Sequence, residues 1–567
     1  KLKGDLENLE SYYLDRGYLN FVVESTQVAI APNMEDVYIT INVDEGQQFK
    51  VGRVEISGEL RDIPEASIRQ LILSREGQIY SRELMTASEE RIEMILGNAG
   101  YTFSSATGNP ALSEDGETVV VRFFVDAGKR AYVRRISFRG NTLTQDEVLR
   151  RELRQMEGGW ASNAYIEASK VRLERLGFFK EVNVENVPVP GVNDQIDVVY
   201  TVEEQPSGSI GASIGYAQGY GTILGANLSE NNFLGSGKQL SVGINRSTYQ
   251  ESVNLSFTEP YFTVDGVSVG YSIFARETDY DQINVSSFST NAKGANVNWG
   301  YPISEVERVG FGVGFENLDV RYGAYASQEI RNFIDTNGSK FDVFNLNLNW
   351  RKSTLNRGMF ATRGTSQRLA LNVALPGSGL EYYKATYKGQ YLRGLTRSLS
   401  LKLRADLGYG ESYGDTSQLP FFKNFYGGGF GSVRGFESNS LGPQDTPCSG
   451  SAESCNNQSA YNRPDPIGGN VQIEFGSEVI FPMPFVKDKR SMQSAFFIDA
   501  GNIFNTKCGD TQLNCFKPDV GELRYSVGIG VTWLSAMGPL TFSYAKPLNS
   551  SEYDETENFQ FSLGNQF

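Results

Sequence analysis

Between residues 207 and 567, many segments alternate with a period of two: apolar side chains take one face, and small or polar side chains take the other. Segment 525–534 is typical, with its apolar side chains on one face: Tyr525, Val527, Ile529, Val531 and Trp533. A period of two indicates β-strands with one apolar face. The region contains about 16 such strands, and a closed barrel of that size is too wide for side chains to fill its interior. We therefore predict a transmembrane antiparallel β-barrel over residues 207–567, with its apolar face toward lipid.

The connections between the predicted strands differ in length. Some are tight, such as Asp265-Gly266, whereas segments 323–340 and 411–468 are long. Short periplasmic turns and long external loops are typical of bacterial outer-membrane barrels, and an even strand number places both barrel ends on the periplasmic side. The chain contains no run of about 18 apolar residues, so transmembrane helices are not expected.

The N-terminal region contains a repeat of domain size. Gly17, Gly100 and Gly177 are spaced 83 and 77 residues apart, and an aromatic residue follows each of them. In each copy this pair ends a helical pattern and begins a strand, which suits glycine as a left-handed helix cap. The matching last strands are 37–44, 118–126 and 195–203. Each complete copy has the order β-α-α-β-β.

This repeat predicts the domain organisation. Residues 51–128 and 129–206 each contain a complete unit, whereas residues 1–50 contain only a final helix and two strands. We therefore expect the parent protein to continue upstream of this N-terminally truncated chain. In the third unit, Thr144 and Glu147 match a capping box for a helix that runs to about Met156. A second helix is predicted from Ser162 to Leu176.

Composition narrows the possible functions. The net charge of −15 argues against nucleic acid as a partner, because phosphate binding favours a basic surface. The chain has no histidine and no CxxC spacing, so we expect neither a metal site nor a cofactor. The four cysteines form two local pairs in loop-like sequence, Cys448/Cys455 and Cys508/Cys515. Two disulfides in external loops are expected; the alternative is four reduced surface thiols.

The longest predicted loop contains a glycine-rich stretch, FFKNFYGGGFGSVRGFESNSLGP, at residues 421–443. It is not a phosphate loop, since neither a GK[ST] sequence nor a helix follows it. The stretch, with its Val433-Arg434-Gly435-Phe436 motif, resembles the loop that folds back into the barrel lumen in the BamA family. The repeats resemble POTRA domains, and the EPYFTVDG segment at 259–266 and the aromatic C-terminus also fit. The resemblance covers essentially the whole chain. Family members typically have five POTRA domains, which agrees with truncation.

The resemblance implies a non-enzymatic function: insertion of other β-barrel proteins into the bacterial outer membrane without ATP. The implied partners are unfolded outer-membrane proteins, accessory periplasmic lipoproteins docked on the POTRA modules, and outer-membrane lipids. A nascent barrel has unpaired edge strands, which are costly in lipid. A barrel that opens between its own first and last strands would offer a matching edge.

The resemblance also assigns roles to individual residues. It places Glu478 and Asp499 as the partners of Arg434, and the alternation in segments 471–479 and 495–501 puts both carboxylates on the lumen face. The predicted seam joins strands 207–216 and 558–567, where glycines would weaken the pairing. We expect a kink at Gly564, and we expect Gly211 to lie close to Ser562 across the seam, in this or a nearby register. The seam residues are Gly208, Gly211, Gly215, Ser562, Gly564 and Phe567.

Four other functions are compatible with a β-barrel of this kind. An outer-membrane hydrolase usually needs a histidine base, which this chain lacks. A passive porin would not explain the N-terminal repeats. A TamA-like autotransporter assembly factor has three POTRA units, and the partial first copy is compatible with that. A two-partner secretion pore has two units and an N-terminal plug helix that this sequence does not show.

Overall fold

The computed structural model describes residues 2–30, 37–323, 326–396, 398–447, 464–483, 491–508, 515–535 and 538–564. The chain divides into two compact units, Lys1–Pro206 and Ser207–Phe567. Within the described residues, no helix is both long enough and apolar enough to cross a membrane.

The N-terminal unit contains the three predicted repeats. In the two complete modules the first strand pairs in parallel with the last strand, which also pairs with the middle strand in antiparallel orientation. The predicted β-α-α-β-β order is confirmed. The elements are α1 (Leu2–Leu14), β1 (Val22–Ile30) and β2 (Val37–Asp44); β3 (Lys50–Glu59), α2 (Glu65–Arg69), α3 (Arg82–Asn98), β4 (Ser105–Leu112) and β5 (Thr118–Asp126); and β6 (Tyr132–Arg139), α4 (Asp146–Arg150), α5 (Asn163–Arg175), β7 (Phe179–Pro188) and β8 (Gln195–Glu204).

The repeated glycines adopt the backbone conformation that their position requires. Gly17, Gly100 and Gly177 have φ values of 91°, 100° and 73°, so each ends its helix in a left-handed conformation. Asp15 and Asn98 precede Gly17 and Gly100 by two residues, and each accepts a hydrogen bond from the next module through a side-chain oxygen. Asp15 Oδ1 accepts the backbone N–H of Glu83 at 2.8 Å. Asn98 Oδ1 accepts that of Ala164, also at 2.8 Å. Successive modules are thus joined by the same contact at the start of α3 and of α5.

The capping box predicted in the third module is wrong. Helix α4 begins only at Asp146, follows Gln145 without a side-chain cap, and ends at Arg150. The carboxylate of Glu204, at the end of β8, accepts the hydroxyl of Thr142 at 2.6 Å and the backbone N–H of Thr144 at 2.7 Å. A residue distant in sequence therefore satisfies the backbone groups that precede the helix.

This contact predicts a pH-dependent local stability. Burial raises the pKa of Glu204, but the hydrogen bonds from Thr142, Thr144 and Leu143 outweigh it and lower the pKa to about 2. Because the folded-state pKa is depressed, the stabilisation is complete above the unfolded value of about 4.5 and is lost as the pH falls toward 2. We expect Glu204→Gln to speed hydrogen exchange of amides 142–144 at least about tenfold at neutral pH, since one charge-assisted bond contributes about 1.5 kcal/mol.

The neighbouring substitution Glu203→Gln is the matched control, because Glu203 is exposed and pairs only with Lys180 at 2.8 Å among the described residues. It should leave exchange of amides 142–144 unchanged. Equal exchange in wild type and Glu204→Gln would show that the carboxylate does not hold this segment.

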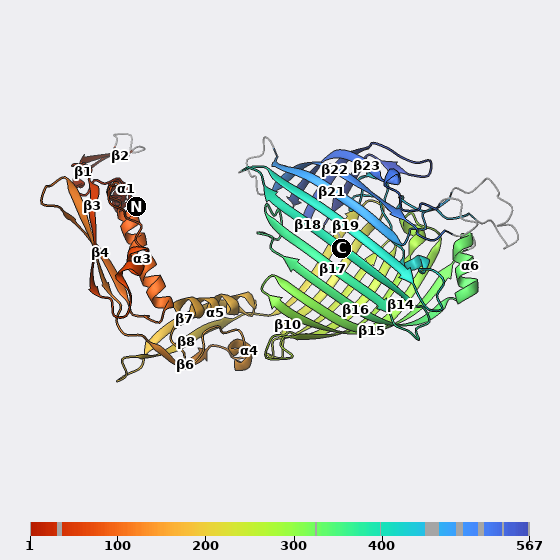
Figure 1. The fold of residues 1–567 in the computed structure, drawn as a ribbon, viewed down its shortest axis with the longest axis horizontal. Helices are drawn as coiled ribbons and strands as arrows, with labels where there is room; N and C mark the ends of the chain where they lie inside the picture. The colour runs from red at the N-terminus through yellow and green to blue at the C-terminus, as the bar shows by residue number, and fades with distance from the viewer. Residues whose placement is uncertain are drawn as a thin grey trace. The chain divides into compact units, whose positions relative to one another are not determined.

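The C-terminal unit is a closed barrel of sixteen antiparallel strands, as predicted (Figure 1). The strands are β9 (Gly208–Ala217), β10 (Gly221–Phe233), β11 (Lys238–Ser247), β12 (Gln250–Glu259), β13 (Ser268–Asp279), β14 (Phe288–Ser304), β15 (Glu307–Tyr322), β16 (Lys340–Ser353), β17 (Gly364–Ala374), β18 (Tyr382–Gly394), β19 (Ser400–Ser412), β21 (Val471–Pro482), β22 (Met492–Phe504), β23 (Arg524–Ser535), β24 (Gly538–Pro547) and β26 (Phe559–Leu563). Exposed aromatic and aliphatic side chains lie on the outer face, as at Phe496 and Ile498.

The long loops pack together at one end of the barrel, beside helix α6 (Gln328–Asn337) (Figure 1). Phe333 of this helix stacks edge-to-face on Phe421 and Phe422, with ring centroids 5.4 and 6.0 Å apart. These residues belong to a buried apolar cluster that also includes Phe288 and Phe341. The loops at this end therefore share a buried apolar core with the barrel strands β14 and β16. The short 3-10 helices are η1 (Tyr280–Ile283), η2 (Phe421–Lys423) and η3 (Val520–Glu522).

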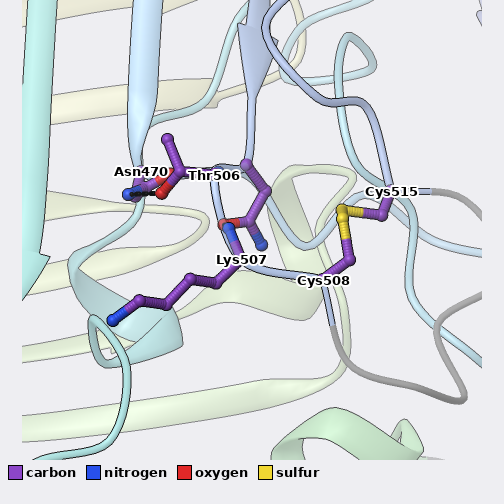
Figure 2. The surroundings of a disulfide bond; sticks show 6 residues. Asn470, Thr506, Lys507, Cys508 and Cys515 are labelled. Carbon is purple, nitrogen blue, oxygen red and sulfur yellow. Dashed lines mark hydrogen bonds between the residues drawn. A yellow bond between two sulfur atoms is a disulfide. The ribbon is translucent and has the colours of Figure 1, made fainter.

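One predicted disulfide is confirmed and the other lies outside the described residues. Cys508 and Cys515 are bonded in the connection between β22 and β23 (Figure 2). The loop is anchored next to the bond, because Asn470 donates to the Thr506 hydroxyl at 2.8 Å and accepts the Thr506 N–H at 2.9 Å. Cys448 and Cys455 are outside the described part of the chain, and their pairing remains a prediction.

We expect the Cys508–Cys515 bond to order its loop rather than to support the barrel. Closing so short a loop contributes about 2–3 kcal/mol at most in the chain-entropy account. The double variant Cys508→Ser/Cys515→Ser should retain the heat-modifiable gel mobility of a folded barrel. Its loop should be cut faster by protease. Intact cells carrying Cys448→Ser/Cys455→Ser should show no thiol labelling until reductant is added. Strong labelling without reductant would contradict the bond.

Candidate functional site: the lumen loop and the seam

Arg434 is the centre of a charged cluster on the lumen wall. Its Nε donates to Asp499 Oδ2 at 2.6 Å and its Nη2 to Asp499 Oδ1 at 2.9 Å, which is the bidentate geometry that guanidinium groups favour. Nη2 also lies 2.9 Å from Glu478 Oε1. The guanidinium stacks over the ring of Phe497, 3.4 Å from its centroid. Asp499 is fully buried and the Arg434 side chain is 11% exposed.

The strand alternation explains how the two carboxylates meet this arginine. Glu478 lies on β21 and Asp499 on β22, and both point inward while Phe475, Phe496 and Ile498 are exposed on the outer face. The loop supplies Arg434 from its Val433–Phe436 motif, where Val433 and Phe436 are fully buried. The structure thus brings together the three charged residues expected at this site.

Further polar contacts hold the loop on the same wall. Lys402 donates to Glu478 Oε2 at 3.1 Å, so this carboxylate has two cationic partners. Arg404 donates to the carbonyl oxygens of Gly431, at 2.6 Å, and Ser432. The Ser432 hydroxyl donates to Glu474, which is itself buried. Lys402 and Arg404 were missed in the sequence, although their alternation with outward Leu403 marks both as lumen residues.

The loop also pairs with the end of the chain. Strand β20 (Gly435–Phe436) forms a small antiparallel sheet with β25 (Thr556–Glu557), directly before the last barrel strand. Gln560 of β26 donates to the carbonyl oxygen of Phe436 at 2.7 Å. The motif therefore contacts the backbone that leads into one side of the predicted seam.

Among the described residues, the seam is the shortest strand pairing of the barrel. Up to Gly564, where the description of the chain ends, β26 and β9 share two residue pairs, Ser562 with Ala217 and Leu563 with Tyr216. By comparison, β9 shares ten pairs with its other neighbour, β10. Next to the second pair, Gly564 has a φ of 90°, and a Cβ built on it would lie 3.3 Å from Gly215 Cα. The two backbones therefore approach each other closely at Gly564 and Gly215.

The other expected seam residues are placed as follows. Gly208 and Gly211 lie on β9 and pair with β10, opposite Glu230 and Asn227. The expectation that Gly211 lies near Ser562 is wrong, because the register puts Ala217 opposite Ser562. An antiparallel register moves Gly211 six residues along the strand from that pair. Phe567 lies outside the described residues.

One residue connects both sides of the seam with the loop, through its side chain and its backbone carbonyl. Gln218, directly after β9, donates to the carboxylate of Glu557 and accepts the backbone N–H of Phe561 at 3.2 Å. Its own carbonyl oxygen accepts the Ser438 hydroxyl at 3.3 Å. Gln218 and Gln560 were not singled out in the sequence, although Gln560 interrupts an apolar run between Phe559 and Phe561.

No group of acidic or cysteine side chains in the described ranges could hold a metal ion. The interactions at this site are ion pairs, hydrogen bonds and strand pairings between parts of one chain. Such a site can position a loop and a strand edge.

Comparisons with known proteins agree with this architecture. An Omp85 superfamily domain matches residues 232–567, and the POTRA family, described as a surface antigen variable number repeat, matches residues 1–46, 49–128 and 131–205. Outer membrane protein assembly factor BamA from Neisseria meningitidis serogroup B is 34% identical, in an alignment that covers 100% of this chain and 73% of that protein. BamA from Nitratidesulfovibrio vulgaris is 25% identical, covering 100% and 68%.

A solved structure is similar over both units. BamA from Haemophilus ducreyi lacking POTRA domains 1–3 has a TM-score of 0.80 and 33% identity, and the match covers 91% of this chain and 99% of that one. The barrel, the POTRA modules and the extent of these matches together show that the chain belongs to the Omp85 superfamily and, within it, to the BamA family of outer-membrane barrels with periplasmic POTRA domains.

Proposed function

We propose that this protein folds β-barrel proteins and inserts them into the bacterial outer membrane through the seam between β9 and β26, without ATP. The observation that carries the proposal is that the described part of β26 pairs with β9 at two residues, whereas β9 and β10 share ten residue pairs. The relatives named as outer membrane protein assembly factors support the same function.

Physical chemistry explains why such a seam suits the task. Unpaired backbone groups cost several kcal/mol each in lipid, so a continuous barrel wall does not open readily. In the described part of the seam, parting the two residue pairs exposes few such groups. The freed edge of β9, Gly208–Ala217, can then pair with an incoming strand and recover those hydrogen bonds by β-augmentation.

The lumen loop is anchored both to the barrel wall and to the two sides of the seam. Arg434 holds the loop on β21 and β22, and Gln560 and Gln218 connect it to the two sides of the seam. When the short pairing parts, these polar contacts would keep the strand ends positioned in the lumen. The POTRA modules, with exposed strand edges, are suited to receive unfolded clients and accessory periplasmic lipoproteins.

The experiment is reconstitution of the purified chain in liposomes with an unfolded client barrel and no nucleotide. We expect the client to acquire the heat-modifiable gel mobility of a folded barrel faster in liposomes that contain the protein than in empty liposomes. Equal rates with and without the protein would overturn the proposal. In cells, depletion of the parent protein should deplete outer-membrane barrels generally, whereas loss of autotransporters alone would favour a TamA-like role.

A further inference from the structure

A row of basic side chains crosses the lumen wall on four neighbouring strands, β15 to β18. The cross-strand register places Arg308 opposite Arg351 and Arg351 opposite Arg368. Arg368 in turn lies opposite Lys388. Directly opposite residues of antiparallel strands share one face. That face is the lumen, because the adjacent residues Val309 and Leu369 belong to the exposed apolar outer surface. We call this the basic row; it consists of Arg308, Arg351, Arg368 and Lys388.

The three arginines of the basic row have no carboxylate directly opposite them, whereas Lys388 lies opposite Asp406, which pairs with Arg404 at 3.6 Å. Among the residues that the structure describes, no ion pair joins any of its four members to a carboxylate, although many other charged residues of the barrel are paired. On the wall formed by β21 and β22, the lumen carboxylates of Glu478 and Asp499 have cationic partners. Like charges directly opposite each other are destabilising in a sheet. The row therefore concentrates positive potential where an external anion can reach it.

A cavity of about 620 Å³ lies against this row. Three of the four cations line it, and amide side chains of neighbouring strands complete much of its wall. The amide residues are Asn254, Asn298 and Asn349. Guanidinium groups bind carboxylates, and amides both donate to and accept from peptide groups. The cavity thus offers partners for the side chains and for the backbone of a polypeptide.

We propose that the basic row binds an acidic, extended polypeptide segment inside the barrel lumen. This inference rests on the proposed function, in which the segment belongs to a client. With strands about 4.8 Å apart, the row spans about 14 Å, the length of about four extended residues. The closed wall separates the row from the bilayer, and its lining of asparagine and arginine suits peptide better than acyl chains. Neighbouring charges lie within a Debye length, so they act together on the ligand.

The test is binding of a fluorescent peptide of alternating glutamate and serine to the purified full chain in detergent micelles. We expect Arg308→Gln/Arg351→Gln/Arg368→Gln to weaken binding at least tenfold, and a glutamine–serine peptide to bind weakly to either protein. The matched control also removes three cations, each from an exposed ion pair elsewhere on the barrel: Arg246→Gln/Arg321→Gln/Lys507→Gln. It should bind the acidic peptide as wild type does.

Gel mobility before and after heating confirms that each variant is a folded barrel. If the triple variant does not fold, the single change Arg351→Gln at the centre of the row should weaken binding at least threefold. Unchanged affinity in the folded variants would overturn the proposal. Full displacement of the peptide by equimolar inorganic phosphate or phosphatidylglycerol would also overturn it, in favour of a general anion site. Because this assay needs no insertion activity, its failure is distinguishable from failure of the proposed function.

Discussion

Replacing Arg434 with alanine is expected to release the lumen loop and to reduce assembly activity at least about tenfold. The substitution leaves the fully buried Asp499 without the guanidinium that now neutralises it at 2.6 Å. Removing one partner of a buried ion pair costs about 3–5 kcal/mol, and about 1.4 kcal/mol already corresponds to a tenfold change in an equilibrium. The measurements are protease cleavage within residues 421–443 and the rate of client folding in liposomes.

Two further variants separate loop positioning from the cost of an unpaired charge. Arg434→Met/Asp499→Asn removes both charges, so it should regain stability toward unfolding while the loop stays cleavable and assembly stays slow. Arg321→Ala is the control for loss of an arginine, because its side chain is 69% exposed and pairs only with Asp319 among the described residues. It should change neither readout, since exposed pairs contribute about 0–1 kcal/mol. Wild-type loop protection and assembly in Arg434→Ala would contradict the positioning role.

Much of the fold was predictable because its signals are local. The alternation of side chains gives the barrel strands, and glycines 17, 100 and 177 mark the ends of helices in left-handed conformation. The capping box failed because Glu204, about sixty residues away, satisfies the backbone before α4. In α5, Ser169 is buried and its hydroxyl donates to the carbonyl of Tyr165, while the larger Tyr165 side chain is exposed, so the buried face of this helix does not follow side-chain hydrophobicity alone.

The candidate site was predictable only in part, for a related reason. The inward position of Glu478 and Asp499 follows from a period of two, whereas their approach to Arg434 depends on how a long loop folds. The register at the seam was not available from either strand, since it depends on where the pairing of β26 begins and ends. For that reason Gly211 was placed near Ser562, where the structure has Ala217. Gln218 and Gln560 act through contacts with residues more than a hundred positions away in the sequence, which no local pattern reports.

Locking the seam is expected to abolish insertion of client barrels. Ala217→Cys/Ser562→Cys introduces thiols at directly opposite positions of β9 and β26, where Cβ atoms lie about 4.5–5.5 Å apart, so oxidation can join them with little movement. A covalent bond, and not only the short backbone pairing of β26 with β9, would then have to break before the seam opens. Client folding in liposomes should fall to the rate without protein after oxidation and return after reduction. Gel mobility should show that the barrel is folded in both states.

The matched control places the same bond within the continuous wall. Thr532→Cys/Thr541→Cys joins β23 to β24 at directly opposite lumen positions, where the threonine hydroxyls are now 3.3 Å apart. These strands share ten residue pairs and do not need to separate in the proposed mechanism, so oxidation there should leave client folding unchanged. Inhibition by both bonds would mean that general stiffness of the barrel limits the reaction. Normal client folding with the oxidised Ala217→Cys/Ser562→Cys protein would rule out lateral opening, because β9 and β26 would then be held together throughout the reaction.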